Sequence, residues 1–351
     1  MKKRLVQATG LAMLASVVTF CLLNGYLNDH KNVPATSPRH IGRVHQSSET
    51  TLSRLTFQHQ AFNQSNTEVD SDIITEQSTT KHSTRHLLLT FEPYGRLGNA
   101  MFQYAGLLGI AKMNNRTPFV LPGSVLTRNF NLSNVKSVAH LERWLHLGEP
   151  RYAAYNPAFK NLPEENLVLQ AYLQSYKYFY NISSEIKREF HFLDRTDKAA
   201  RKLVTSSMPS GGDWITVGVH VRRGDKLTRK ELTLGEVIPT RSYFRKAMDW
   251  MRDKHGHVVF LVATDDTVWT KANVLGSDVV LLPLASADVH MAALSKCNHV
   301  IMSVGTFGWW AGYFSDGDVI YFNTTMKTGS PKSRGFAPQD FFLPYWIGMG
   351  D

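Results

Sequence analysis

The chain has 351 residues, of which 43% are hydrophobic, 11% aromatic and 19% charged. That length suits one large or two medium globular domains with a sizeable core, and the aromatic content excludes disorder as the main state. Two cysteines exclude a disulfide scaffold or a cysteine-rich zinc module. The formal net charge of +10 favours an acidic partner, and nucleic acid, anionic lipid and a phosphorylated small molecule all fit it.

The N-terminus has the pattern of a membrane anchor. Lys2, Lys3 and Arg4 precede residues 5–27, which contain no Asp, Glu, Lys, Arg or His. At about 1.5 Å per residue this stretch exceeds the roughly 30 Å of bilayer hydrocarbon, and preceding basic residues favour a cytosolic N-terminus. A cleaved signal peptide is the alternative, but its apolar core would span only roughly 7–15 residues. We expect a cytoplasmic tail at 1–4, a transmembrane signal anchor at 5–27 and a lumenal remainder.

Residues 28–85 are rich in Ser, Thr, Asn and Gln, and their only aromatic residues are Phe57 and Phe62. Such a segment buries too little apolar surface to offset its ordering entropy, so we expect a flexible stem. With Cys21 in the anchor, Cys297 is the single lumenal cysteine, and we expect it to be a small buried apolar residue. In a lumenal chain nucleic acid is no longer an expected partner, and the N-x-S/T motif marks candidate N-glycosylation sites at Asn63, Asn115, Asn131, Asn181 and Asn323.

The folded part is expected to begin near His86 and to form two lobes, roughly 86–205 and 213–351. In the first, an apolar run at 87–91, a glycine-containing turn, a buried helix at 100–113 and a strand at 118–121 indicate a β-turn-α-β unit of a parallel sheet. The region 125–205 shows no clear periodicity apart from an amphipathic, charged segment at 185–203. The run at 206–212 (SSMPSGG) is typical of a linker.

The second lobe alternates between short apolar runs and helix-compatible stretches. This alternation predicts a doubly wound parallel sheet, whose ligands bind beyond the carboxyl ends of the strands. The fold class predicted is therefore α/β, with two Rossmann-like lobes and a cleft between them. The expected strands are 215–221, 258–263, 279–282, 299–303 and 319–322.

The clearest chemical signal follows the strand at 215–221. Arg222 and Arg223 are adjacent at its carboxyl end, where two guanidinium groups would suit a phosphate or diphosphate. Asp225 could hold one guanidinium group in place or act on a hydroxyl group itself. The alternative is an ordinary surface ion pair between arginine and aspartate, and the apolar strand that leads into the pair favours a binding role.

Three other strand ends carry candidate residues. Gly95, Gly98 and Asn99 lie in a turn before a helix, where backbone N–H groups can approach an anion. Ser303 and Thr306 follow the strand at 299–303 and could donate to phosphate oxygens, whereas Phe307 is expected to pack the lobe. Asp265 follows the strand at 258–263, where a carboxylate could accept from a base or a ribose.

Metal-site patterns are weak. Asp316 and Asp318 have the D-x-D spacing of manganese-dependent sugar-nucleotide enzymes, but they lie just before an apolar strand and are more typical of a surface turn. The fourteen histidines are scattered without a zinc-binding spacing. We therefore expect no metal ligands and no cofactor.

Four segments together carry a family resemblance: 95–105 (GRLGNAMFQYA), 217–225 (VGVHVRRGD), 303–311 (SVGTFGWWA) and 341–346 (FFLPYW). In order and spacing they resemble the galactoside α-1,2-fucosyltransferases, glycosyltransferase family 11, over most of residues 86–351. The resemblance implies GDP-fucose as donor, the 2-hydroxyl of a terminal β-galactoside as acceptor, and inversion at the fucose anomeric carbon. It also implies a GT-B-type fold, no essential metal, and a type II Golgi membrane enzyme.

The resemblance further implies roles for matching positions. Arg222 would be catalytic, binding the GDP diphosphate with Arg223, and His220 would shape the site. The remaining donor-binding residues implied are Gly95, Gly98 and Asn99 on one lobe, and Ser303, Thr306 and Phe307 on the other. From their positions in the glycine-containing turn and after the strand at 258–263, we also expect Arg96 and Asp265 to bind the donor. Ala100 departs from the commoner pattern, in which Gln follows the Asn.

The chemistry of the implied reaction leaves one role open. Departure of GDP develops negative charge on the diphosphate, which arginine can stabilise in place of a metal. For the base that deprotonates galactose, Asp225 is one candidate and Glu92 a weaker one, and a strongly dissociative route would need little base. Two other functions fit the same motifs: transfer from the same donor to a different acceptor, and non-catalytic binding of glycans in the lumen. The oligomeric state is not predicted.

Overall fold

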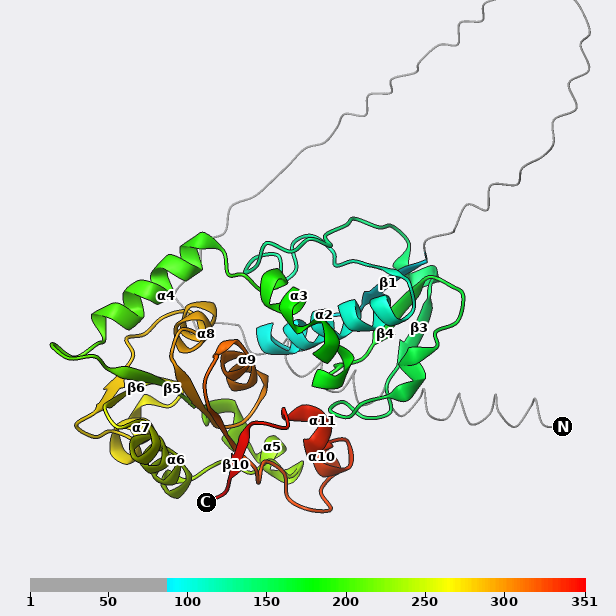
Figure 1. Cartoon of the computed structure of the whole chain (residues 1–351). Coiled ribbons are helices and arrows are strands. Elements are labelled where there is room, and N and C mark those ends of the chain that lie inside the picture. Colours follow the sequence, from blue (N-terminus) through cyan, green and yellow to red (C-terminus); the bar gives the residue numbers. More distant parts are fainter. Residues whose placement is uncertain (1–86) are drawn as a thin grey trace, which may run out of the picture. The chain divides into compact units, whose positions relative to one another are not determined.

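The computed structural model describes residues 87–351, which are coloured in Figure 1. The expected cytoplasmic tail, signal anchor and stem, with the sequon at Asn63, lie outside the described residues. Among residues 87–351, no helix is both long enough and apolar enough to cross a bilayer.

The first lobe is built on a four-stranded, wholly parallel sheet in the order β2-β1-β4-β3. Its strands are β1 (Leu88–Phe91), β2 (Thr117–Pro118), β3 (Leu145–Gly148) and β4 (Leu167–Gln170). The expected helix is confirmed as α2 (Leu97–Met113), which begins three residues earlier than predicted and is buried along most of its length. The predicted strand at 118–121 is wrong in extent. The backbone of Val120 pairs instead with Asn134 and Lys136, which draws the chain out of the sheet.

The region without sequence periodicity consists of short elements joined by irregular chain. Besides β3 and β4 it contains four 3₁₀ turns and two α-helices. They are η2 (Leu141–Arg143), η3 (Pro157–Lys160), η4 (Tyr176–Tyr178), η5 (Tyr180–Ile182), α3 (Ser183–Glu189) and α4 (Asp194–Ser206). Helix α4 packs on the second lobe although it precedes the linker: Thr196 Oγ1 donates to Asp288 Oδ2 at 2.8 Å, and Lys296 pairs with Asp197.

The second lobe is a six-stranded parallel sheet in the order β10-β9-β8-β5-β6-β7. The five predicted strands are confirmed to within one residue, and a sixth, β10, was not predicted. The strands are β5 (Ile215–Val221), β6 (Val258–Thr264), β7 (Val279–Leu281), β8 (His299–Met302), β9 (Val319–Phe322) and β10 (Ile347–Met349).

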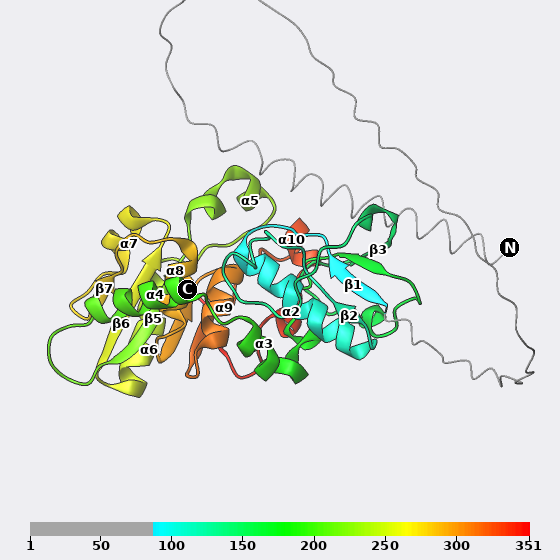
Figure 2. The same cartoon turned by 90° about the horizontal axis from the view of Figure 1, so that it is seen from above.

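Helices cover this second sheet on both faces (Figures 1 and 2). Tyr243 and Phe244 of α6 belong to one core cluster, whereas α8 and α9 contribute to the other. The elements are η6 (Gly224–Leu227), α5 (Arg229–Thr233), α6 (Arg241–His255), α7 (Thr267–Asn273), α8 (Ala287–Leu294), α9 (Thr306–Phe314), α10 (Pro331–Arg334) and α11 (Pro338–Phe341).

One of these two hydrophobic core clusters contains residues of both lobes. Helix α9 of the second lobe packs against α2 of the first, as both views show. Phe102 of α2 lies 4.4 Å from Trp309 and 5.1 Å from Trp310 between ring centroids, and all three side chains are fully buried. The indole of Trp310 donates to the Gly98 carbonyl at 2.9 Å. This shared core fixes the start of α2 against the start of α9, which is where the candidate site lies.

The expectation for Cys297 is confirmed, because its side chain is buried and forms no disulfide within residues 87–351. Burial raises the pKa of its thiol to about 12, so the thiol stays protonated and unreactive at neutral pH.

Candidate active site

The candidate site forms where β1, β5 and β8 end. Strands β5 and β8 are neighbours, so the residues that follow them meet at one edge of the sheet. Ser303, fully buried after β8, joins the two ends: its Oγ accepts from the backbone N–H of Arg222 at 2.9 Å. The same hydroxyl lies 3.3 Å from His220 Nδ1. Ser303 therefore fixes the backbone from which the Arg222 side chain leaves the strand.

Asp225 holds the guanidinium group of Arg222 in two places. Arg222 Nε donates to Oδ1 at 3.1 Å and Nη2 donates to Oδ2 at 2.8 Å. Arg96, from the first lobe, approaches the same carboxylate at 3.5 Å. Burial alone would lower the pKa of Arg222, but the hydrogen bonds and charge of Asp225 raise it above its ordinary value. The arginine is therefore firmly charged, and its planar group has a set orientation.

The guanidinium nitrogen of Arg222 that does not bind Asp225, Nη1, lies beside the start of α9. Gly305 has a φ of +88°, and a Cβ at this position would lie only 2.9 Å from Arg222 Nη1. Only glycine suits this combination of left-handed backbone and close approach. No side chain caps the N-terminus of α9, so the N–H groups of its first turn lie unmatched beside a guanidinium group. A helix N-terminus combined with a fixed cation is a binding site for an anion.

The start of α2 completes this arrangement from the first lobe. Asn99 Oδ1 accepts from Thr306 Oγ1 at 2.8 Å and from Gln174 Nε2 at 3.1 Å. Gly98 lies against the Thr306 side chain, and Gly95, at φ +75°, lies against Asn99. Helix α2 also has no side-chain cap. The first turns of two helices, one from each lobe, are therefore joined directly by a hydrogen bond.

His220 is a buried wall of the site. Its side chain stacks on Phe307 with ring centroids 5.0 Å apart, and a Cβ at Gly308 would lie 2.5 Å from its Nδ1. Burial, together with the charge of Arg222, lowers the pKa of His220 to about 3. The imidazole is therefore neutral at physiological pH, which suits a role in packing and hydrogen bonding rather than proton transfer.

The structure separates Arg223 from Arg222. The guanidinium carbon of Arg223 lies 3.8 Å from the ring centroid of Trp269, and Arg223 Nε lies 3.4 Å from Asp266 Oδ2. Adjacency in sequence suggested a two-guanidinium fork, but the two groups have different neighbours and no such fork forms here. Asp265 accepts from the backbone N–H groups of Arg223 and Gly224 at 2.8 and 3.3 Å, so its carboxylate holds this loop.

Sequence reasoning missed two contributors to this geometry, Gln174 and Trp269, and it named Asp266 only as part of the segment that follows the strand at 258–263. Gln174 lies in the region without periodicity, and no local pattern indicated that its amide would reach Asn99. Trp269 and Asp266 belong to α7 and its N-terminal cap, and only the fold brings them to Arg223. Glu92, the weaker candidate base, accepts from Gln170 Nε2 at 2.8 Å at the carboxyl ends of β1 and β4.

Comparison with known proteins identifies the family. Residues 55–350 match the model of Glycosyl transferase family 11. The chain belongs to glycosyl transferase family 11.

Curated relatives of this family 11 chain include mammalian enzymes. Galactoside 2-alpha-L-fucosyltransferase SEC1 of Bos taurus is 33% identical over 292 residues, which cover 77% of this chain and 76% of that protein. Galactoside alpha-(1,2)-fucosyltransferase 1 of Bos taurus is 34% identical, covering 74% and 75% respectively. Galactoside alpha-(1,2)-fucosyltransferase 2 of Sus scrofa is 32% identical, covering 79% and 85%. Among solved structures, fucosyltransferase NodZ from Bradyrhizobium has a TM-score of 0.46 and 17% identity, covering 70% of this chain and 98% of that chain.

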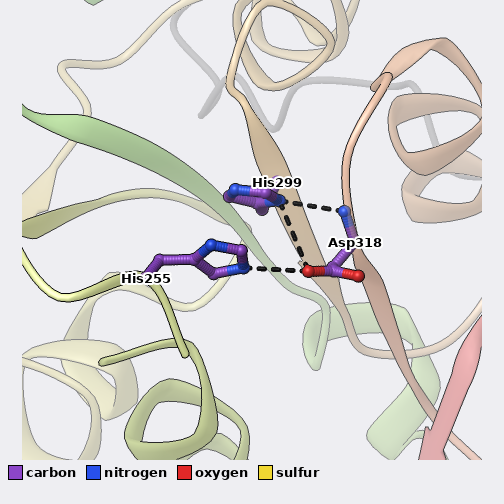
Figure 3. Close-up of side chains that lie close together, drawn as sticks. All are labelled: His255, His299 and Asp318. Carbon is purple, nitrogen blue, oxygen red and sulfur yellow. Dashed lines mark hydrogen bonds and ion pairs between the residues drawn. The ribbon is translucent and has the colours of Figure 1, made fainter. Parts of the chain in front are cut away.

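The two aspartates with D-x-D spacing do not share partners in this family 11 glycosyltransferase. Asp316 is exposed and pairs with Lys187 at 2.9 Å. Asp318 instead lies beside His255 and His299 (Figure 3). His299 begins β8, whereas Ser303 follows the other end of that strand. Asp318 Oδ2 is 2.8 Å from His255 Nε2 and 2.7 Å from Lys254 Nζ, and its backbone N–H donates to His299 Nδ1 at 2.9 Å.

The geometry of this cluster fits an ion pair better than a metal centre. The two imidazoles stack face to face, with centroids 3.8 Å apart and planes at 21°, so their in-plane lone pairs do not converge. An ammonium group already neutralises the carboxylate, and the free nitrogen of His299 already accepts a hydrogen bond. Metal-binding histidines direct an in-plane lone pair at the ion, which these contacts do not allow without rearrangement.

The sequons within the described residues are accessible. The asparagine side chains at all four positions are exposed, so each can be reached by a modifying enzyme. They are Asn115, Asn131, Asn181 and Asn323.

Proposed function

We propose that this chain is a galactoside α-1,2-fucosyltransferase, which moves L-fucose from GDP-fucose to the 2-hydroxyl of a terminal β-galactoside with inversion. Membership of family 11 and the names of the relatives support the reaction class. The observation that carries the proposal is structural. Arg222 is fixed by Asp225 and Ser303, and its free edge lies against the uncapped start of α9.

This arrangement suits stabilisation of the leaving group. The bond between the fucose anomeric carbon and the β-phosphate oxygen breaks, its electron pair stays on GDP, and the galactose oxygen attacks the opposite face of the sugar. Negative charge therefore grows on the diphosphate as positive charge grows on fucose. Arg222 and the first-turn N–H groups of α9 meet that negative charge without reorganising, so the chemistry needs no metal ion and no cofactor.

Asp225 serves this role indirectly. Burial would raise its pKa, but hydrogen bonding to Arg222 and the charges of Arg222 and Arg96 hold the pKa below its ordinary value. A carboxylate with a lowered pKa and both oxygens engaged is a poor proton acceptor. We assign Asp225 to orienting Arg222, and we propose that the galactose proton leaves late, to solvent water, after fucose–phosphate cleavage is advanced.

The donor is proposed to lie between the lobes of a GT-B-type fold. Asn99 and Thr306 place the first turns of α2 and α9 together, and Gly95, Gly98 and Arg96 line the first-lobe side. His220 and Phe307 form an apolar wall on the second-lobe side. Asp265 fixes the loop of Arg223, whose guanidinium group lies farther toward α7.

We further propose a type II Golgi membrane protein, with the lumenal domain acting on galactose-terminated glycans of glycoproteins or glycolipids. The basic residues at 2–4, followed by the uncharged segment 5–27, support an anchor whose C-terminal side is lumenal. The exposed sequons are compatible with that side of the membrane.

Full-length protein, purified in detergent, should transfer radiolabelled fucose from GDP-fucose to members of a β-galactoside panel that includes lactose and xyloglucan-type oligosaccharides. The product should be cleaved by an α-1,2-specific fucosidase and resist one specific for another linkage. Transfer to a hydroxyl other than the galactose 2-hydroxyl would favour the alternative acceptor. GDP-fucose binding without transfer to any member would favour a non-catalytic glycan-binding protein.

A further inference from the structure

Glu149 is a buried carboxyl group with one satisfied and one unsatisfied oxygen. It follows β3 directly and is 5% exposed. Its Oε1 accepts from the backbone N–H groups of Tyr172 at 2.6 Å and Leu173 at 3.2 Å. Its Oε2 is buried and has no hydrogen-bond partner among residues 87–351. Buried carboxyl groups are costly, so one kept in this state calls for a function.

The segment that Glu149 holds, residues 171–175, joins several parts of the molecule, and we call it the junction loop. Its contacts reach α2, the start of the candidate site and the C-terminal region. Ala171 O accepts from Gln103 Nε2 at 2.8 Å, Gln174 Nε2 donates to Asn99 Oδ1 at 3.1 Å, and Ser175 Oγ donates to Asp340 O at 2.8 Å.

The junction loop contains a strained residue that needs external support. Leu173 has a φ of +52°, in the left-handed region that a γ-branched side chain rarely adopts, and it packs against Gly106 of α2. Its backbone N–H would be orphaned without Glu149. Because Gln174 is the next residue, the conformation of Leu173 sets the direction of the amide that reaches Asn99.

The surroundings of Glu149 favour its uncharged form. Burial raises its pKa well above the ordinary value, and the hydrogen bonds from Tyr172 and Leu173 offset only part of that effect. No described cation forms an ion pair with it, and the titratable group whose pKa it perturbs is Tyr178, whose hydroxyl accepts from Asn156 N–H at 2.8 Å. In the uncharged form Oε1 is the carbonyl oxygen that accepts both backbone N–H groups.

We propose that Glu149 is a positioning residue for the sugar-nucleotide donor, acting through the junction loop on Gln174 and through Gln174 on Asn99. It touches no substrate. Asn99 Oδ1 accepts from both Gln174 and Thr306, so Gln174 selects the amide orientation that leaves this oxygen facing α9. The inference rests on the proposed function, because the affected ligand is GDP-fucose.

The test compares substitutions at Glu149 with matched substitutions at Glu189, in the full-length protein. Glu189 is a second buried carboxyl group of the first lobe. It accepts from Tyr104 Oη at 2.6 Å and from Ser133 N–H at 3.0 Å, and its hydrogen bonds are not made with the junction loop. Loss of one orienting hydrogen bond at the donor should weaken binding about tenfold. Glu149→Leu should therefore raise the KM for GDP-fucose about tenfold with little change in kcat.

Conservative and coupled variants separate positioning from general destabilisation. Glu149→Gln keeps one acceptor oxygen and should retain the wild-type KM, and Glu189→Leu should lower the melting temperature without raising KM. Gln174→Leu should raise KM as Glu149→Leu does, and the double variant should be no worse than either single variant. A wild-type KM for GDP-fucose in a folded Glu149→Leu variant, or in Gln174→Leu, would overturn the inference. A double variant whose KM rises by the product of the two single effects would also overturn it.

Hydrogen exchange of the backbone amides tests the role of Glu149 in holding the junction loop without depending on fucose transfer. Absence of fucose transfer by the wild-type protein would contradict the function, and the inference is then decided by the amides of Tyr172 and Leu173. Glu149→Leu should speed their exchange, whereas Glu189→Leu should not. Unchanged exchange in Glu149→Leu would show that Glu149 does not hold the junction loop. The Gln174→Leu variant gives the kinetic answer even where Glu149→Leu fails to fold.

Discussion

Thr306 Oγ1 donates to Asn99 Oδ1 at 2.8 Å, and this bond joins the first turn of α9 to the first turn of α2. Neither helix has a side-chain cap, so the positive ends of two helix dipoles lie together. Arg222 adds a fixed guanidinium group beside one of them. Such positive potential suits a glycosyltransferase whose donor is a nucleoside diphosphate sugar, because negative charge develops on the leaving group as the transition state is reached.

The pH dependence of kcat/KM distinguishes a role of Asp225 in orienting Arg222 from a role as the base. Asp225→Asn keeps one acceptor for Arg222 but removes the charge, so we expect kcat/KM to fall about ten- to hundredfold. The acid limb of the pH–rate profile should keep its midpoint, because Asp225 is not the group that accepts the galactose proton. Loss of that limb in the variant, measured between pH 4 and pH 8, would instead identify Asp225 as the base.

Close packing at His220 makes Gly308 intolerant of a side chain. A Cβ at Gly308 would lie 2.5 Å from His220 Nδ1 and 2.9 Å from Met302 Cβ. We expect Gly308→Ala to cost about 1–3 kcal/mol of unfolding free energy and to reduce transfer. Gly276→Ala is the matched control, since its nearest neighbour would be 3.5 Å away. Equal stability of the two variants in chemical denaturation would contradict the packing described here.

Because His220 is buried and neutral, we expect the free energy of unfolding to decrease as the pH is lowered. Burial, together with the charge of Arg222, lowers the pKa of His220 to about 3, whereas the unfolded chain takes up a proton near pH 6.5. Between these values the unfolded state binds more protons, so unfolding free energy is lost as pH falls, by about 1.4 kcal/mol per unit.

His220→Asn isolates this contribution from those of other groups, because asparagine can still approach Ser303 but does not titrate. The difference in unfolding free energy between wild type and variant should shrink from pH 6.5 toward pH 4. A difference that stays constant over that range would mean that His220 is protonated in the folded protein.

Much of the second lobe was predictable because its central strands are long apolar runs. Strand β5 is buried at all but its first residue, which gives a sequence signal that needs no knowledge of the fold. Strand β3 was missed because it has only four residues and its ends are exposed, so it gives no apolar run to detect. Strand β10 was missed because it is a three-residue edge strand, and its sequence Ile-Gly-Met has no periodicity to detect.

The candidate site was predictable only as far as strand ends reveal it. Arg222, Ser303 and Asn99 were found because chemistry-bearing residues follow apolar strands in parallel sheets. Arg223 was placed beside Arg222 because the two are adjacent at the carboxyl end of β5, whereas its contacts with Trp269 and Asp266 take its side chain to α7. Gln174 and Glu149 act through a left-handed backbone turn at Leu173, and no local pattern specifies that turn.

Metal removal tests the proposed way of stabilising the leaving group. With Arg222 and two helix N-termini at the proposed position of the diphosphate, we expect fucose transfer to survive EDTA with little loss. His299→Ala should likewise leave transfer unchanged, because His299 begins β8 and the candidate site lies beyond its other end. Loss of transfer in EDTA that added Mn²⁺ restores would show that a metal ion takes the role assigned to Arg222.

The most direct test is the rate of fucose transfer by Arg222→Ala compared with Arg245→Ala, an exposed arginine of α6. Loss of a preorganised charge at the leaving group costs on the order of 10²–10³ in rate. Arg222→Ala should show that loss at saturating GDP-fucose with its far-ultraviolet circular dichroism unchanged, and Arg245→Ala should match wild type. A folded Arg222→Ala that transfers fucose at the wild-type rate would contradict the account.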